Sequence, residues 1–206
     1  FGFILESGLF VIEKIGLRGL DNPSEYLLKN NTNEKSSGSA VVPCMEGLHP
    51  ILVEIQALAV HSMTAIPRRI ASGYDFNRLV ILLAVLEKKA KIPFSSDDVY
   101  LSVVGGYKVR ETAADLSVAL SLVSVKHDNP LASDMVALGE IGLTGEILPV
   151  SLIENRLKEA VKMNFRKFIL PERNKKEVIN FIENEQTLLL ENVFFVKNIH
   201  ETIGHI

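Results

Sequence analysis

Residues 139–149 read Gly-Glu-Ile-Gly-Leu-Thr-Gly-Glu-Ile-Leu-Pro, and this stretch decides how the rest of the chain is interpreted. Its glycines separate short apolar runs, which predicts brief strands joined by a tight glycine turn. The pattern downstream predicts a helix over residues 152–163, followed by a strand, a helix and a strand at 167–170, 175–182 and 193–196. Strands and helices therefore alternate through the C-terminal part of the chain.

Upstream of this stretch, residues 99–104 are β-rich and stop at Gly105-Gly106. A second helix is expected over residues 113–126, where apolar residues recur at helical spacing. Asp75 can cap the start of another helix that runs to about residue 89, because its carboxylate can accept from free amides of the first turn. We expect an α+β fold with a mixed sheet and packed helices.

The N-terminal third begins with an alternating, strand-like segment and a short helical segment that ends at residue 28. Residues 29–39 are polar and predict a mobile loop. Strands are expected at 40–45 and 51–60, joined by a hairpin loop at 47–50. We therefore divide the chain into an N-terminal hairpin and linker segment, 1–37, and a main domain, 38–206.

Composition excludes several classes of protein. The 206 residues are 47% hydrophobic with a formal net charge of −3, which argues against disorder, and Cys44 is the single cysteine. No apolar run approaches the ~20 residues of a membrane span. A Walker-type phosphate loop is absent, and the spacing of the histidines gives no reason to expect a metal. Phe1 suggests that the chain is part of a longer protein, and the lone Cys44 suggests a buried side chain in a reducing compartment.

Charge is unevenly distributed. Residues 66–110 contain eight Lys or Arg and four Asp or Glu, although the whole chain is acidic. Such a basic zone suits phosphate contacts that do not depend on base sequence. The alternative is that Arg78 and Arg110 pair with Asp75, Glu111 or Asp115 and brace the fold. The candidate DNA-binding residues are Arg68, Arg69, Arg78, Lys108 and Arg110.

The 139–149 stretch resembles the hairpin of Lon-type peptidase domains, which leads into the helix that bears a catalytic lysine. In that family the nucleophilic serine lies in Gly-Pro-Ser-Ala-Gly at a helix start. Matching these motifs to the chain puts Ala113 at the serine position and Glu154 at the lysine position. A methyl group cannot attack a carbonyl and a carboxylate reverses the charge of the base, so we expect no catalytic residue. Thr112 is expected to cap the helix.

Shorter motifs resemble the C-terminal domain of the RadA/Sms family more narrowly. The fold implied is that of the Lon proteolytic domain, which is similar to ribosomal protein S5 domain 2. Phe1 and Gly2 match the end of that family's Lys-Asn-Arg-Phe-Gly motif. The other matching segments are residues 20–25, 38–40, 52–58, 67–69, 75–78, 98–101 and 113–116.

This resemblance implies a DNA-binding, ring-assembling domain, without peptidase activity, in an ATPase that drives branch migration during recombination. ATP with Mg and zinc would then bind other domains of the whole protein, and no cofactor is expected in these residues. The implied partners are single-stranded or branched DNA, a RecA-type recombinase and further copies of the chain, with a hexameric ring expected. Cytoplasm or an organelle is the expected location. The alternatives are an active Lon-like serine peptidase and an oligomerisation domain without DNA contact.

Overall fold

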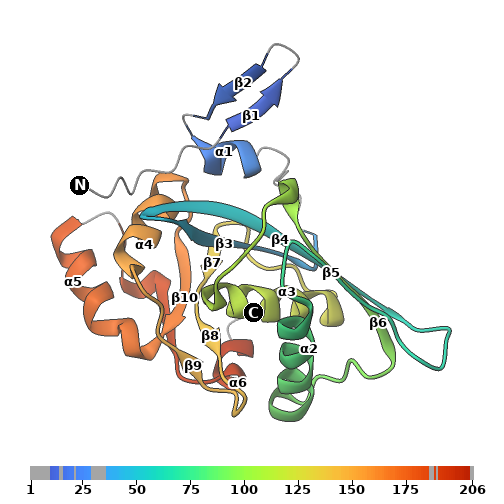
Figure 1. Cartoon of the computed structure of the whole chain (residues 1–206). Helices are drawn as coiled ribbons and strands as arrows, with labels where there is room; N and C mark the ends of the chain where they lie inside the picture. The colour runs from blue at the N-terminus through green and yellow to red at the C-terminus, as the bar shows by residue number, and fades with distance from the viewer. Residues whose placement is uncertain are drawn as a thin grey trace, which may run out of the picture.

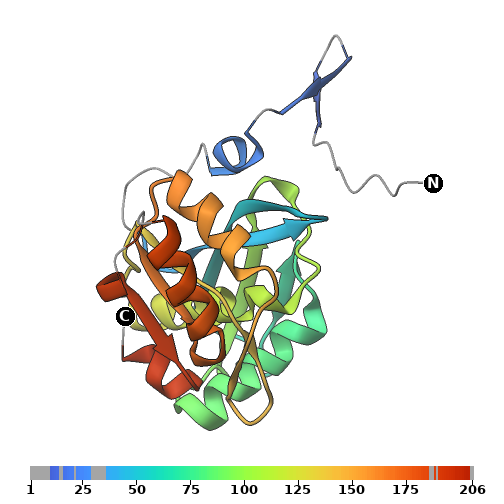
Figure 2. The same cartoon turned by 90° about the vertical axis from the view of Figure 1, so that its left-hand side faces the viewer.

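The computed structural model describes residues 10–13, 16–20, 22–28, 36–185, 188 and 190–204. Within them a seven-stranded mixed sheet carries packed helices, so the expected α+β class is confirmed (Figures 1 and 2). Phe1, Gly2 and residues 29–35 lie outside the described residues, and so does the loop prediction for that segment.

The main sheet has the strand order β11-β10-β7-β3-β4-β6-β5. β4 is antiparallel to both of its neighbours, β3 and β6, whereas β7, β10, β11 and β5 join their neighbours in parallel. Two small antiparallel sheets, β1-β2 and β8-β9, stand apart from it. The strands are β1 Phe10–Glu13, β2 Gly16–Gly19, β3 Ser39–Glu46, β4 His49–His61, β5 Arg69–Ser72, β6 Asp97–Val103, β7 Met135–Ala137, β8 Glu140–Ile141, β9 Ile147–Leu148, β10 Lys167–Pro171 and β11 Val193–Val196.

The helices alternate with the strands as the sequence predicts, except that the short C-terminal helix and β5 were not expected. α1 and α4 lie on one side of β3 and β4, and α3 lies on the other (Figure 1). The helices are α1 Pro23–Leu28, α2 Phe76–Val85, α3 Asp115–His127, α4 Ile153–Lys162, α5 Lys175–Glu185 and α6 Ile199–Ile203.

The β3-β4 hairpin forms the centre of the sheet. Glu46 pairs with His49, so its connection is a two-residue turn. Residues 40–44 and 51–55 are buried without a break, because helices cover both faces of these strands. The predicted strands and hairpin are confirmed.

α2 begins as predicted at Asp75, whose carboxylate accepts a 2.7 Å hydrogen bond from the Arg78 amide. The helix continues into a π-helical turn, Leu86–Ala90, and ends at Lys91 in a left-handed conformation. The expected end near residue 89 is therefore confirmed within two residues.

α3 is a central helix rather than a helix with one buried face. Every residue from 115 to 124 is buried, including three serines. The Ser117 hydroxyl lies 2.7 Å from the carbonyl oxygen of Ala137, and the Ser121 hydroxyl donates to Val118 at 2.8 Å. Backbone acceptors thus satisfy polar groups that the apolar spacing alone would have left facing water.

α1 packs on the main body although it precedes the predicted boundary at residue 37. The Ser24 hydroxyl accepts from the Leu52 amide at 3.1 Å and donates to the Glu159 carboxylate at 2.6 Å. One buried side chain therefore links α1 to β4 and to α4. The division of the chain at residue 37 stays a prediction.

Candidate functional site

The segment that corresponds to the serine motif of Lon-type peptidases lies at the start of α3. A 3-10 turn, Thr112–Ala114, leads directly into that helix. Ala113 is 6% exposed and belongs to the hydrophobic core. The Thr112 hydroxyl donates to the Glu140 carboxylate at 2.7 Å rather than capping the helix, so the capping prediction is wrong.

The segment that corresponds to the lysine motif is the first turn of α4. Glu154 is exposed there, whereas Arg156, two residues further on, is buried at 1% exposure. The Arg156 guanidinium donates to the Glu111 carboxylate at 2.6 and 2.8 Å and to the Pro43 carbonyl at 2.7 Å. An ion pair, rather than a serine and a lysine, therefore joins these two segments.

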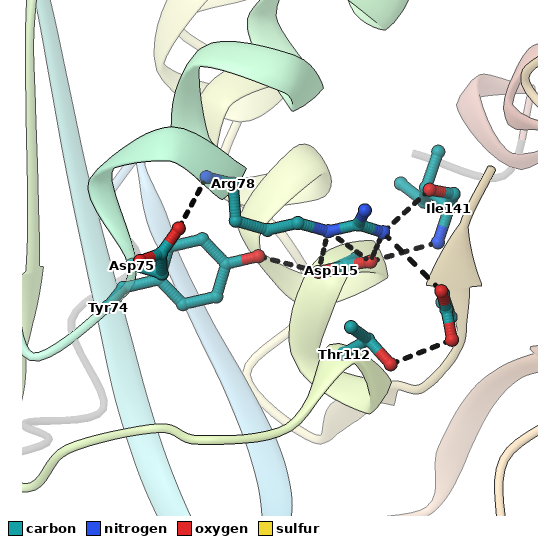
Figure 3. Close-up of polar contacts among 7 residues, drawn as sticks. Tyr74, Asp75, Arg78, Thr112, Asp115 and Ile141 are labelled. Carbon is teal, nitrogen blue, oxygen red and sulfur yellow. Dashed lines mark hydrogen bonds and ion pairs between the residues drawn. The ribbon is translucent and has the colours of Figure 1, made fainter. Parts of the chain in front are cut away.

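Beside this segment, Tyr74, Arg78 and Asp115 form a buried polar network (Figure 3). The Asp115 carboxylate accepts from the Tyr74 hydroxyl at 2.6 Å, from the Ile141 amide at 3.0 Å and from the Arg78 guanidinium. The same guanidinium donates to the Ile141 carbonyl at 2.7 Å. The network joins α2, α3 and β8.

The network shifts the titration of its members. Burial raises the pKa of Asp115 above its ordinary value, while the hydrogen bonds from Arg78 and Tyr74 act in the opposite direction. The pKa of Arg78 is raised by its hydrogen bond to Asp115. Burial also raises the pKa of Tyr74, and the neighbouring Asp115 charge adds to the effect. These groups brace the fold, as the alternative interpretation of Arg78 anticipated.

The five basic candidates do not form one surface. Arg68 and Arg69 lie beside the start of β6, since Arg69 pairs with Val99, whereas Lys108 and Arg110 follow the end of that strand. The four residue steps of strand from Val99 to Val103 span ~13 Å between the two places. Arg78 is engaged by Asp115.

The two arginines of the first group have different surroundings. The Arg69 guanidinium donates to the backbone carbonyls of Phe94, at 2.7 Å, and of Asp97. Arg68 is exposed, and its side chain forms no hydrogen bond or ion pair with any residue that the structure describes. Only Arg68 of this pair therefore has a guanidinium available for an external ligand.

Lys108 and Arg110 lie together at a pocket of about 390 Å³. Both are exposed, and within the described part of the chain neither side chain has a hydrogen-bonded or ion-paired partner. The alternative interpretation, in which Arg110 pairs with Asp75, Glu111 or Asp115, is therefore wrong for Arg110. The pocket is lined by Phe10, Leu20, Pro23, Tyr26, Leu27, Glu46, Gly105, Gly106, Tyr107, Lys108 and Arg110.

The pocket and the Arg156–Glu111 pair were not predicted. Their members come from segments far apart in sequence, and a buried arginine on a helix has the same local pattern as a solvated one. Among the described residues there is no cluster of three or more potential metal ligands, and no helix is long and apolar enough to cross a membrane.

Comparisons with known proteins agree with this architecture. The model of the Lon protease (S16) C-terminal proteolytic domain matches residues 84–206. The DNA repair protein RadA of Salmonella typhimurium is 49% identical over 174 residues, which are 84% of this chain and 38% of that protein. RadA of Escherichia coli is 48% identical over 174 residues, with the same coverage of both chains. RadA of Haemophilus influenzae is 44% identical over 204 residues, 99% of this chain and 43% of that protein.

The chain therefore belongs to the Lon protease (S16) C-terminal proteolytic domain family. Within it, the predicted relationship to RadA/Sms proteins is confirmed by these identities. The chain spans about two fifths of the length of the curated relatives that it matches.

Proposed function

We propose that this chain is a non-proteolytic Lon-like domain that contacts DNA and supports assembly in a DNA repair protein. The relatives that it matches are named DNA repair proteins. The observation that carries the proposal is a pair of cations at a pocket that have no partner among the described residues. They lie in a domain whose peptidase positions hold a buried alanine and an exposed glutamate.

The absence of peptidase activity follows from the chemistry of those two positions. A serine–lysine dyad needs a hydroxyl to attack and a desolvated amine to take its proton. Ala113 has no hydroxyl, and Glu154 is an exposed acid. Thr112 is held by Glu140, with no amine from α4 as its base.

Incubation with unfolded casein and with a serine-reactive phosphonate probe tests this part of the proposal. We expect neither cleavage nor labelling, in the wild type or in Thr112→Ala. Cleavage by the wild type that is lost in Thr112→Ala would identify Thr112 as a nucleophile and overturn the proposal. Cleavage that persists in both would overturn it as well.

DNA contact is proposed through Lys108, Arg110 and Arg68, because their charged groups are exposed and form no hydrogen bond or ion pair with a described residue. Such side chains neutralise phosphates and release counterions without reading the base sequence. Binding should therefore be independent of sequence and weaken steeply with salt. Arg78 and Arg69 are left out of the proposed interface, since each is committed to internal acceptors.

The test compares the full-length Lys108→Ala/Arg110→Ala variant with Lys88→Ala/Lys176→Ala, which loses the same charge at two exposed lysines elsewhere. Each lost phosphate contact should lower the log–log salt slope by about 0.7 for a single strand. We expect a decrease of about twice that in the first variant and little change in the control. Equal slopes in both variants would show that this surface does not contact DNA.

The remaining parts of the proposal concern the whole protein. We propose that the whole protein is a cytoplasmic or organellar ATPase with zinc and ATP–Mg sites in other domains. It would drive branch migration and cooperate with a RecA-type recombinase. Branch migration and ATP hydrolysis by the full-length protein, measured with and without the recombinase, test this part. A full-length protein that hydrolyses no ATP in the presence of DNA would contradict it.

Assembly into a ring, expected as a hexamer, is supported by an apolar row across three strands. Leu58, Tyr100 and Ile70 are direct cross-strand neighbours on β4, β6 and β5, and Leu58 and Ile70 are 51% and 50% exposed. β5 is also an edge of the main sheet. Mass photometry of the full-length protein with ATP and DNA should detect the ring, and Leu58→Asp/Ile70→Asp should disrupt it. A monomeric wild type would contradict assembly.

A further inference from the structure

The pocket at Lys108 and Arg110 combines three kinds of surface. Phe10, Tyr26 and Leu27 contribute apolar and aromatic walls, and Tyr26 is 44% exposed. The two cations stand at the rim. Glu46 contributes a carboxylate to the lining.

The walls are held in place by contacts within the fold. Ser24 links α1 to β4 and α4, which places Tyr26 and Leu27. The Tyr107 hydroxyl donates to Glu46 at 2.8 Å, so the ring and the carboxylate are oriented together. The pocket is therefore built before a ligand arrives, which reduces the entropic cost of binding.

One side of the pocket depends on a close backbone approach. Gly105 has φ 76°, and a Cβ atom there would lie 2.6 Å from Leu27 Cδ2. Gly106 has φ 72° with open space around it. The double glycine thus lets the loop turn tightly beneath α1, and Lys108 and Arg110 emerge just beyond it.

These features define the ligand chemically. A flat, partly apolar group suits the aromatic wall, and an attached anion suits the two cations. The Glu46 carboxylate can accept from a ring N–H or an amino group. A nucleotide has all three features, and about 390 Å³ lies within the range of small-ligand pockets.

We propose that this pocket binds one nucleotide of single-stranded DNA, with its base against Tyr26 and Tyr107 and its phosphate on Lys108 and Arg110. The inference rests on the proposed DNA contact and goes beyond it, because it assigns a place to a base. Paired bases are stacked within a duplex and cannot enter, so the pocket selects single strands. Because every base has a π-face, little sequence preference is expected.

Photo-cross-linking of the full-length protein to an oligonucleotide containing 5-iododeoxyuridine tests the inference. Mass spectrometry should find the cross-link on Tyr26, Tyr107 or Phe10. Tyr26→Ala should weaken single-strand affinity about tenfold and leave duplex affinity unchanged. Phe76→Ala, which removes an exposed ring from the first turn of α2, is the matched control and should leave both affinities unchanged.

The outcomes separate this inference from the proposed function. Cross-links that map outside the pocket, with single-strand binding intact, would overturn the inference that a base binds in the pocket. They would not contradict the proposed contact with DNA. No binding of any DNA at low salt would overturn the proposed function itself. Occupation of the pocket by free dAMP while the oligonucleotide cross-links elsewhere would overturn its assignment to DNA. Equal loss of single-strand and duplex affinity in Tyr26→Ala would contradict the stacking role.

Discussion

Arg156 and Glu111 join the two segments that carry the catalytic dyad in Lon-type peptidases. Arg156 Nη2 lies 2.6 Å from Glu111 Oε2, and Nη1 lies 2.8 Å from Oε1, in a paired, fork-like geometry. Glu111 Oε1 also accepts from the Met45 amide at 2.8 Å. The pair therefore holds the start of α4, the approach to α3 and the end of β3 in one arrangement.

Removing the buried cation should be costly. Arg156→Ala leaves the Pro43 carbonyl and the Glu111 carboxylate without their donor, and breaking such a pair typically costs about 3–5 kcal/mol. Urea unfolding measures the change. Lys158→Ala is the control, because its pair with Glu185 is solvent-exposed and is expected to contribute under about 1 kcal/mol. Equal stability of the two variants would contradict a structural role for the Arg156 pair.

The Asp115 network should behave as a coupled unit. Asp115→Ala leaves Arg78 and Tyr74 without their shared acceptor, and we expect a loss of about 3 kcal/mol or more. Tyr74→Phe removes one hydroxyl and should cost about 1 kcal/mol. A double-mutant cycle between Arg78→Ala and Asp115→Ala should give a coupling energy above about 1 kcal/mol, measured by denaturant unfolding. Strict additivity would show that the two side chains act independently.

Two glycines with similar backbone angles should respond very differently to alanine. Gly73 has φ 77° and Gly106 has φ 72°, so each substitution carries the strain of a left-handed residue, about 1 kcal/mol. A Cβ at position 73 would also lie 2.5 Å from the Tyr107 carbonyl oxygen, whereas position 106 is open. Thermal unfolding should show Gly73→Ala to be several degrees less stable than Gly106→Ala. Equal melting temperatures would mean that the Tyr107 backbone moves without cost.

The Cys44 thiol should be unreactive toward thiol reagents in the folded protein. It is 1% exposed, and burial, reinforced by the Glu111 charge, raises the pKa of its thiol well above the ordinary value. Because the thiolate is the reactive form, a raised pKa lowers reactivity at every pH up to 9. Ellman's reagent should therefore titrate one thiol in urea and essentially none in buffer. Rapid reaction in buffer at pH 8 would contradict the packing around β3.

Much of the fold could be predicted from the sequence, because local patterns of apolar residues, glycines and capping residues agree with the elements that form. The alternating and glycine-bounded strands and the Asp75 cap appear where they were expected. β5 was missed because Arg69–Ser72 is a short edge strand in which Arg69 is half-buried and Ile70 is exposed, so its burial pattern does not appear as an apolar–polar alternation. Its pairing is with β6, 25 or more residues away, and no local pattern reports such a partner.

The candidate site was less predictable than the fold. Lys108 and Arg110 were identified from charge, but the same signal also selected Arg78, which is used internally. Charge in a sequence does not distinguish a solvated arginine from one that stabilises a buried carboxylate. Tyr26 and Glu46 were not identified from the sequence, because their place in the pocket depends on how α1 packs beside the loop that follows β6.

The two halves of the main sheet meet along a narrow seam. β3 and β7 share a single registered pair, Val41 with Val136, whereas β3 and β4 share eight. The Ser117 hydroxyl of α3 lies against the carbonyls of both strands, 3.3 Å from Val41 and 2.7 Å from Ala137. The packing of α3 against both strands therefore reinforces a seam that has one registered pair, and substitutions that loosen α3 should weaken the cooperativity of unfolding between the two parts of the sheet.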